Sequence, residues 1–290
     1  MNPRGGGVVY STGKAVKMKN WKTFAAFAAC LVSACGGRTL RQELEMVPST
    51  ALAHIHVEST LPAELWALLP EEALPVDAAM LREMIDRGPL GITVSGISLT
   101  DFEPQLLLLS RDMPPDTMLA IATRYFQFSI DSTAGRSDLT SPSGAILGSL
   151  ASRDGWTCLY LGPSPRSVMT AWLGLDRSRS LGADSSLARI SGPGGDISLF
   201  IPPGMISFLR VAPIENWVDG WESVESAMSL VQPTAARLDA SFDSFVSLEA
   251  RLVRHDGKVS RVRVEVEDSG FTPEEMLSSL KLLLMAGGML

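Results

Sequence analysis

The sequence predicts an α+β fold, in which an antiparallel sheet is covered on one face by helices. The clearest observation is a set of three alternating segments near the C-terminus, at 235–243, 246–252 and 261–266, typical of a β-meander. Helix signatures interleave with strand signatures over the rest of the chain. Hydrophobic residues make up 46% of the 290 residues, enough to bury a substantial core. We therefore expect one large domain or two smaller ones.

The first predicted strand, at 51–58, has two faces of opposite character. We assign its apolar face to the core: Ala51, Ala53, Ile55 and Val57. Its other face carries His54, His56 and Glu58. Asp77 is then expected to cap a helix that ends at Gly88. Two further strands follow at 91–99 and 105–110, and the second, with four consecutive leucines, is expected to be covered on both sides.

A similar order of elements recurs along the chain. Asp116 is expected to cap a helix through Phe126, and Ser164 and Pro165 open a helix that runs to Leu175. Strands are expected at 144–149, 156–161 and 196–201. A helix at 217–231 places its large apolar side chains on one face, which we interpret as core.

The C-terminal meander alternates apolar with charged residues. Asp256 and Gly257 supply a hairpin turn between its last two strands. The charged face mixes Arg with Asp and Glu, so cross-strand pairing explains it without a ligand. A capping box at 272–275 opens a terminal helix that is expected to cover the apolar face.

The segment before Cys35 indicates an exported protein. Lys19 and Lys22 precede an apolar run of about a dozen residues, shorter than the roughly 20 of a membrane-spanning helix. The residues that lead into Cys35 are Val32, Ser33 and Ala34. This pattern resembles the lipobox of bacterial lipoprotein precursors. The resemblance implies cleavage by signal peptidase II before Cys35 and a covalent lipid, such as palmitate, on that cysteine; an ordinary secretory signal is the alternative.

The resemblance divides the chain into a leader and signal peptide at 1–34, a lipidated tether at 35–46, a first α+β half at 47–190 and a second half at 191–290. Because both halves run strand, helix, strands, helix, a divergent internal duplication is a further hypothesis. Translation begins either at Met1 or at Met18, since 18–22 is a conventional signal opening.

Removal of residues 1–34 changes the charge of the protein. It leaves 20 basic and 32 acidic residues, a net charge of about −12. Such a body lacks the clustered positive charge that nucleic-acid binding needs. It would be repelled by anionic headgroups, so we expect membrane attachment through the lipid. Cys158 would be the remaining free cysteine, and its apolar surroundings in the sequence favour a buried structural thiol.

The three polar residues of the first strand are the only constellation with metal-ligand character. His54, His56 and Glu58 share one face at period two, and imidazole with carboxylate suits zinc. An exposed strand face explains the same pattern, so they are weak candidates and no metal is expected. We assign no catalytic residue, because the sequence has no Gly-x-Ser-x-Gly elbow and no phosphate-binding glycine loop.

Short segments at 47–51, 180–184 and 195–201 resemble an uncharacterised family of bacterial envelope proteins. The resemblance implies a domain of unknown function over most of 46–285, and it brings no catalytic residues.

Together these observations predict a non-catalytic envelope lipoprotein that binds or scaffolds a partner, with the lipid on Cys35 and no other cofactor. The alternatives are an anchored hydrolase, using carboxylates or a His54/His56 metal, and a carrier of an apolar ligand such as a lipid. In a cell with two membranes, Gly36 is not the aspartate-type retention signal of lipoprotein sorting, so the outer membrane facing the periplasm is the expected location.

Overall fold

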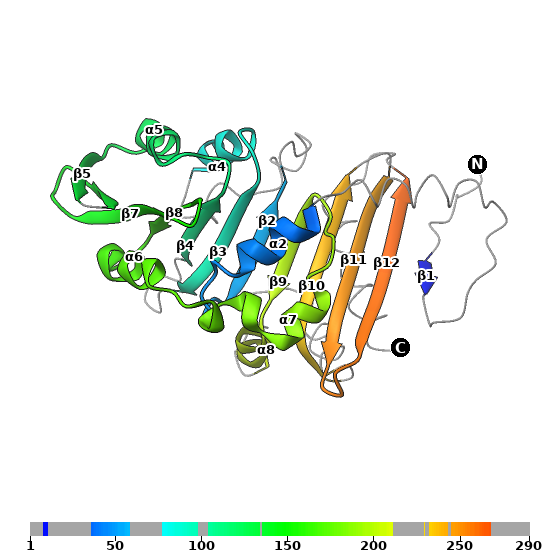
Figure 1. Ribbon diagram of the computed structural model, residues 1–290. Helices are drawn as coiled ribbons and strands as arrows, with labels where there is room; N and C mark the ends of the chain where they lie inside the picture. The colour runs from blue at the N-terminus through cyan, green and yellow to red at the C-terminus, as the bar shows by residue number, and fades with distance from the viewer. Residues whose placement is uncertain are drawn as a thin grey trace. The chain divides into compact units, whose positions relative to one another are not determined.

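The computed structural model (Figure 1) describes residues 8–10, 36–58, 77–97, 104–133, 135–210, 229, 232–242 and 245–267. Antiparallel strands with helices packed against them confirm the predicted α+β class. The chain divides into two compact units, and each is described by itself. Unit 2 is Glu43–Asp184, and unit 1 consists of Met1–Gln42 and Ser185–Leu290.

The sheet of unit 2 is antiparallel throughout, in the order β2-β3-β4-β8-β7-β6-β5 (Figure 1). Its strands are β2 (Ala53–Val57), β3 (Leu90–Ile97), β4 (Pro104–Ser110), β5 (Ser129–Thr133), β6 (Arg136–Thr140), β7 (Ile146–Arg153) and β8 (Trp156–Leu161). The four leucines of β4 are all buried, which confirms that this strand is covered on both sides. Cys158 is a buried free thiol in β8, as predicted.

The helices of unit 2 are α4 (Ala78–Ile85), α5 (Pro115–Tyr125) and α6 (Pro165–Leu173), followed by the short 3₁₀ turns η1 (Arg177–Arg179) and η2 (Leu181–Ala183). The Asp77 side chain accepts a hydrogen bond from the Ala79 N–H and caps α4, as predicted. The prediction that Asp116 caps α5 is wrong. Pro115 takes the first helical position, where its missing N–H costs nothing, so Pro114 becomes the cap.

Unit 1 contains the predicted meander. Its strands β9 (Ile197–Ile201), β10 (Pro233–Phe242), β11 (Phe245–Arg254) and β12 (Val259–Glu267) pair antiparallel in that order, and β1 (Val8–Tyr10) pairs with β12. Gly257 has a φ of 78° in the β11–β12 turn, a conformation that glycine adopts without strain. The predicted hairpin is therefore present.

Two helices of unit 1 cover opposite faces of β10. Ile206 of α8 (Pro203–Leu209) packs against Ala236 and Leu252 on the apolar face. The carbonyl of Ile190, at the end of α7 (Ser185–Ile190), accepts a hydrogen bond from Arg237 on the other face. The charged face of the meander is therefore also covered over part of its width. Helix α7 belongs to unit 1, because the division between the two compact units lies after Asp184.

The expected tether is a helix. Residues of the 35–46 segment form α2 (Gly36–Leu44), in which Leu40, Glu43 and Leu44 are all buried. Their spacing of three and four residues places them on one face of the helix, and this face is buried. Met46 and Val47, which follow the helix, are buried as well. The division between the two units falls within this helix, after Gln42.

Several predicted features lie outside the described residues. They are Cys35 with Val32, Ser33 and Ala34, the helix at 217–231 and the terminal helix after 272.

Candidate functional site

The two histidines of β2 lie on its buried face. His54 is 0% exposed and His56 is 1% exposed, whereas Ala53 and Ile55 on the opposite face are only half-buried. The expectation of an exposed polar face is therefore wrong for this strand, whereas Ala51 and Val57 of the apolar face are buried as well. The physical reason is a polar partner that the local pattern does not reveal: Glu43 of α2, which is itself buried.

Glu43 lies between the two imidazoles. Its Oε1 is 2.8 Å from His54 Nε2, and its Oε2 is 2.8 Å from His56 Nδ1. The second nitrogen of each ring also has a partner: Thr93 Oγ1 at 2.9 Å from His54 Nδ1, and Glu58 Oε1 at 3.2 Å from His56 Nε2. We call these five residues the His–Glu cluster. It runs from the partly exposed Glu58 to the fully buried Thr93.

Gly91 makes the space that Glu43 occupies. It lies directly opposite His56 in the β2–β3 ladder. A Cβ atom at this position would lie 2.3 Å from Glu43 Oε1 and 3.0 Å from His54 Cε1. A side chain at residue 91 is therefore incompatible with the observed position of the carboxylate.

The cluster contains opposite charges in contact. Burial alone would raise the pKa of Glu43, but the charge of His56 and the hydrogen bonds of both imidazoles outweigh it and lower the pKa to about 2. Burial would likewise lower the pKa of His56, but Glu43 and Glu58 stabilise the protonated ring and raise its pKa to about 10. At neutral pH a carboxylate and an imidazolium therefore face each other away from water.

His54, His56 and Glu58, the predicted metal candidates, lie close together in the structure. Hydrogen bonds between His56 and Glu58, and from both histidines to Glu43, hold them there. Glu58 does approach His56, and its side chain remains 37% exposed. Among the described residues, no group of three His, Cys, Asp or Glu side chains is arranged to hold a metal ion. A metal would have to displace the hydrogen bonds that each ring nitrogen already makes.

Thr93, His54 and Glu43 follow the order of a nucleophile, base and acid. Because an ionised Glu43 can only accept, His54 Nε2 carries a proton toward it, and in the neutral ring Nδ1 accepts from the Thr93 hydroxyl. Thr93 is nevertheless 0% exposed. In this conformation no substrate can reach its oxygen, so the arrangement is a closed polar contact. Sequence reasoning missed Thr93 and Glu43, because neither lies in a recognisable catalytic context.

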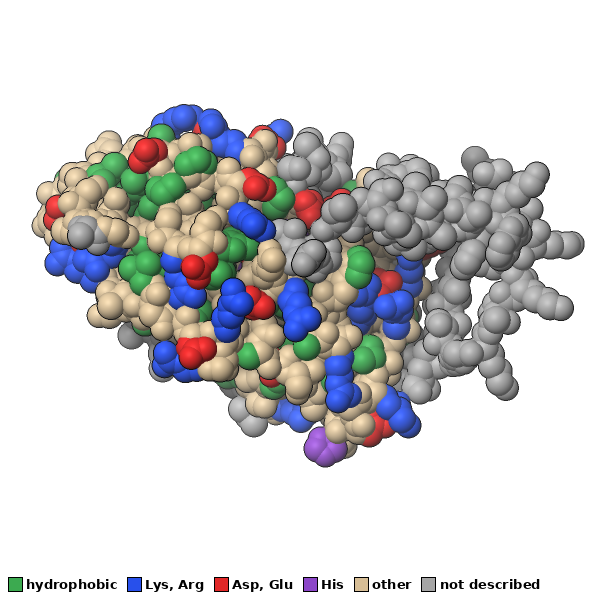
Figure 2. Space-filling model, viewed as in Figure 1, with side chains coloured by type: hydrophobic (Ala, Val, Ile, Leu, Met, Phe, Trp, Pro, Cys, Tyr) green, Lys and Arg blue, Asp and Glu red, His purple; other side chains and the backbone are tan. Residues whose placement is uncertain are grey.

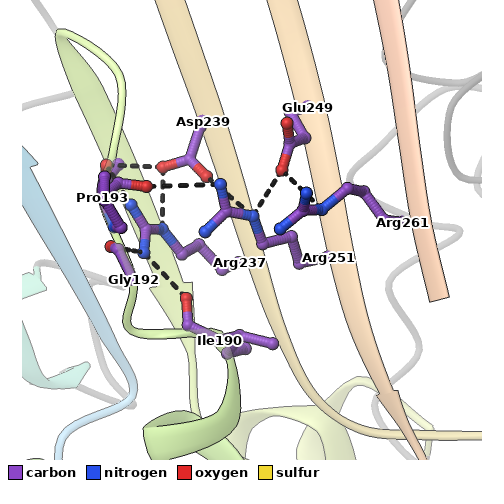
Figure 3. A network of polar contacts seen from close by, with 9 residues as sticks. Ile190, Gly192, Pro193, Arg237, Asp239, Glu249, Arg251 and Arg261 are labelled. Carbon is purple, nitrogen blue, oxygen red and sulfur yellow. Dashed lines mark hydrogen bonds and ion pairs between the residues drawn. The ribbon is translucent and has the colours of Figure 1, made fainter. Parts of the chain in front are cut away.

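A second polar cluster lies on the charged face of unit 1 (Figure 3), where Arg237 is completely buried. Its Nη1 donates to the carbonyls of Ile190 at 2.7 Å and Gly192 at 2.6 Å. Its Nε donates to Asp239 Oδ1 at 2.8 Å, and its guanidinium lies 4.9 Å from the centre of the Phe200 ring. The Gly192–Gly195 segment thus closes over an arginine, which agrees with the expectation that it is a turn and not a phosphate loop.

The charged face of the meander pairs diagonally. Some directly opposite residues carry like charges, as in Asp239 with Glu249 and Arg251 with Arg261, whereas Glu249 lies opposite Arg263. The ion pairs instead join Arg251 to Asp239, at 3.8 Å, and Arg261 to Glu249, at 3.1 Å. In Figure 3 the guanidinium groups alternate with the carboxylates across the strands. Cross-strand ion pairs therefore account for this charged face, as expected, but they join residues that are diagonal neighbours in the ladder and not direct opposites.

The two clusters occupy corresponding positions in the two units. Among the described residues, the order helix, strand, helix, strand, strand occurs twice, as α2-β2-α4-β3-β4 and α7-β9-α8-β10-β11, and α2 itself crosses the boundary between the units. In the ladders, His54 pairs with Thr93 and His56 with Gly91, just as Ser198 pairs with Asp239 and Phe200 with Arg237. In both units the first of these pairs is hydrogen-bonded through its side chains, at 2.9 Å and 2.6 Å. This correspondence supports the hypothesis of two related halves.

A third buried carboxylate, Asp138 of β6, is held in the same way as Asp239. Arg136, two residues earlier, donates from Nε to its Oδ1 at 2.9 Å, and Ser149 on the neighbouring strand donates to the same oxygen at 2.6 Å. Arg166 of α6 donates to Oδ2 at 2.7 Å. Asp138 and Asp239 are thus neutralised by arginine and hydroxyl partners within the fold, which indicates a structural role.

On the surface in view, positive and negative side chains are interspersed (Figure 2). No helix in the part of the chain that the structure describes is long and apolar enough to cross a membrane. Comparisons with protein families, curated proteins and solved structures find no match for this chain. The resemblances to lipoprotein precursors and to an envelope family therefore stay predictions.

Proposed function

We propose that the chain is a lipid-anchored envelope protein whose folded body binds or scaffolds a partner and does not catalyse a reaction. The observation that carries this proposal is the sequence Val32-Ser33-Ala34-Cys35 after a short basic segment and an apolar run too short to span a membrane. Thioether-linked lipid on Cys35 then supplies the attachment, facing the periplasm from the outer membrane in a cell with two membranes.

The polar clusters are arranged for a structural role and not for a catalytic one. A catalytic acid or base needs a reactive atom within hydrogen-bond reach of a substrate. His54 and Thr93 are instead sealed from solvent, and the ring nitrogens of both buried histidines contact other side chains of the protein. The buried acids Asp138 and Asp239 are likewise neutralised by arginines.

Metabolic labelling with an alkyne fatty acid tests the anchor. The wild-type chain should take up label and migrate with membranes, and Cys35→Ala should remove both properties. Cys30→Ala is the matched control, because that cysteine would leave with the signal peptide and label should persist. Label that survives Cys35→Ala would refute the proposal.

Two further measurements separate the body's possible roles. Native mass spectrometry of the gently purified protein should show the bare lipoprotein mass, whereas a co-purifying apolar molecule would identify a carrier. Hydrolysis of a panel of esters and glycosides should be absent, and any activity that disappears in Thr93→Val would identify a hydrolase built on Thr93 and His54 instead.

A further inference from the structure

Helix α2 starts at the residue that follows Cys35 and ends inside the fold. We propose that α2 is a rigid connector that holds the body at a short, fixed distance from a lipid surface, and that the His–Glu cluster fixes its inner end. This inference rests on the proposed lipid anchor at Cys35, and it names the bilayer surface as the partner that the body faces.

The length of the connector follows from helix geometry. Leu40 of α2 is already buried in the fold, so the separation is set by the stretch from Gly36 to Leu40, which at a rise of about 1.5 Å per residue spans roughly 6 Å. A flexible chain of the same length could extend to about 14 Å and would sample many shorter distances. The helix therefore replaces a variable separation with a single short one.

The inner end of α2 is fixed by charge. Glu43 cannot leave its place without removing the closer of the two carboxylates that pair with the His56 imidazolium, because its oxygens contact imidazole nitrogens at 2.8 Å and Glu58 lies at 3.2 Å. Gly91 leaves the space that this carboxylate and the edge of the His54 ring occupy. A helix connected only by apolar contacts could slide or rotate, whereas this one has a single register.

The residues that follow α2 continue the attachment. The Trp172 indole N–H donates to the Met46 carbonyl at 2.9 Å, and the Leu181 N–H donates to the Val47 carbonyl at 2.8 Å. Pro48 then forms a β-bridge with Ser180. Four successive contacts from residue 43 to residue 48 thus join the end of the connector to unit 2 and prevent it from acting as a hinge.

The partner is a lipid surface because the other end of the connector, Gly36, directly follows in sequence the cysteine that would carry the lipid. The acidic body would by itself be repelled from an anionic bilayer. A flexible tether would allow this repulsion to push the body away, and a rigid one would not. The separation should therefore depend little on salt concentration.

Energy transfer from the protein to the membrane tests the inference. The lipidated full-length product is placed in vesicles of phosphatidylcholine and phosphatidylglycerol that contain an acceptor-labelled lipid. A donor is attached to unit 2 through Ser143→Cys, an exposed position, while the native Cys158 is buried and stays unlabelled. Time-resolved transfer then reports the distribution of donor-to-surface distances.

The wild-type protein should give one narrow distribution that is insensitive to salt. Inserting a Gly-Ser linker of about eight residues between Gly36 and Gly37 should widen it about twofold and make it respond to salt. Glu43→Gln should widen it toward the linker variant, and Glu45→Gln, which removes only a surface ion pair with Arg177, should not.

A wild-type distribution as broad as that of the linker variant would overturn the rigid connector while leaving the lipid anchor intact. This comparison needs no destabilised variant, so it stands even if Glu43→Gln fails to fold. Protein that carries no lipid and does not bind vesicles would instead refute the anchor itself, and the connector with it.

Discussion

Glu43 Oε2 and His56 Nδ1 lie 2.8 Å apart, and both side chains are shielded from water. The pair joins the end of a helix to a strand 13 residues further along the chain. Such a buried pair adds little net stability over apolar residues of similar volume, because desolvation offsets the attraction. Removing one partner is costly, however, since the other charge is left unpaired in the interior.

Glu43→Gln should therefore destabilise the fold by about 3–5 kcal/mol, measured by urea denaturation. Glutamine keeps the shape of the side chain but leaves the His56 imidazolium with only the partly exposed Glu58, at 3.2 Å, as a counter-charge. Glu45→Gln is the control, because Glu45 pairs at 3.4 Å with the largely exposed Arg177 and its loss should cost well under 1 kcal/mol. Equal effects of the two substitutions would contradict the view that Glu43 is a buried, charged partner.

The same pair predicts a pH dependence of folding. The pKa of His56 rises from 6.5 to about 10 on folding, so its contribution is complete below pH 6.5 and is lost as the pH rises toward 10. The pKa of Glu43 falls from 4.5 to about 2, so its contribution is complete above pH 4.5 and is lost as the pH falls toward 2. The pair should stabilise the protein most between pH 4.5 and 6.5.

The decrease in the free energy of unfolding above pH 6.5 is the better measurement of the two, because it depends on His56. The His56 contribution should fall by up to about 1.4 kcal/mol per pH unit above pH 6.5. Subtracting the profile of His56→Gln from that of the wild type isolates this slope, and His255→Gln, at an exposed turn position, should reproduce the wild-type slope. Parallel profiles for wild type and His56→Gln would show that His56 is not protonated in the folded state.

The period-two pattern of β2 correctly predicted a strand and its two faces, but not which face is buried. His54 and His56 are buried because Glu43 meets them, and Glu43 lay in a segment that the lipobox made into an expected tether. Alternation within one strand contains no information about a partner more than ten residues away. The burial of β4 and β8 was easier to predict, because a strand that is apolar on both faces is expected to be buried on both.

In the meander, too, the sequence predicts the strands but not which polar side chain is buried. Its strands, turn and mixed charges were predictable from alternation and from Asp256-Gly257. The burial of Arg237 could not be predicted in this way, because its partners are the carbonyls of Ile190 and Gly192 from a preceding helix and loop. Backbone acceptors leave no trace in side-chain patterns, so the sequence alone favoured pairing among the charged side chains.

Arg237→Gln should destabilise the protein by about 3–5 kcal/mol, because it leaves Asp239 buried without its strongest cation and removes the donor to two carbonyls. The double variant Arg237→Met with Asp239→Leu should cost less than the sum of its single changes, with a coupling of about 1 kcal/mol or more. Arg261→Gln is the control, because that side chain is 56% exposed and should cost less than 1 kcal/mol. Strict additivity in the double variant would mean that Arg237 and Asp239 do not depend on each other.

Gly91→Ala tests whether the position of Glu43 is dictated by shape. The added Cβ would lie 2.3 Å from Glu43 Oε1, so the carboxylate must move away from His54 or the strand must shift. We expect a loss of about 1–3 kcal/mol in the free energy of unfolding, and a smaller additional loss when the change is made in a Glu43→Ala background, where the clash is gone. Gly204→Ala is the matched control: nothing lies within 4 Å of its added Cβ, and α8 should gain up to about 1 kcal/mol from the better helix former. If Gly91→Ala were as harmless as Gly204→Ala, the carboxylate could not lie over residue 91, and the helix that carries it would have to meet β2 in another register.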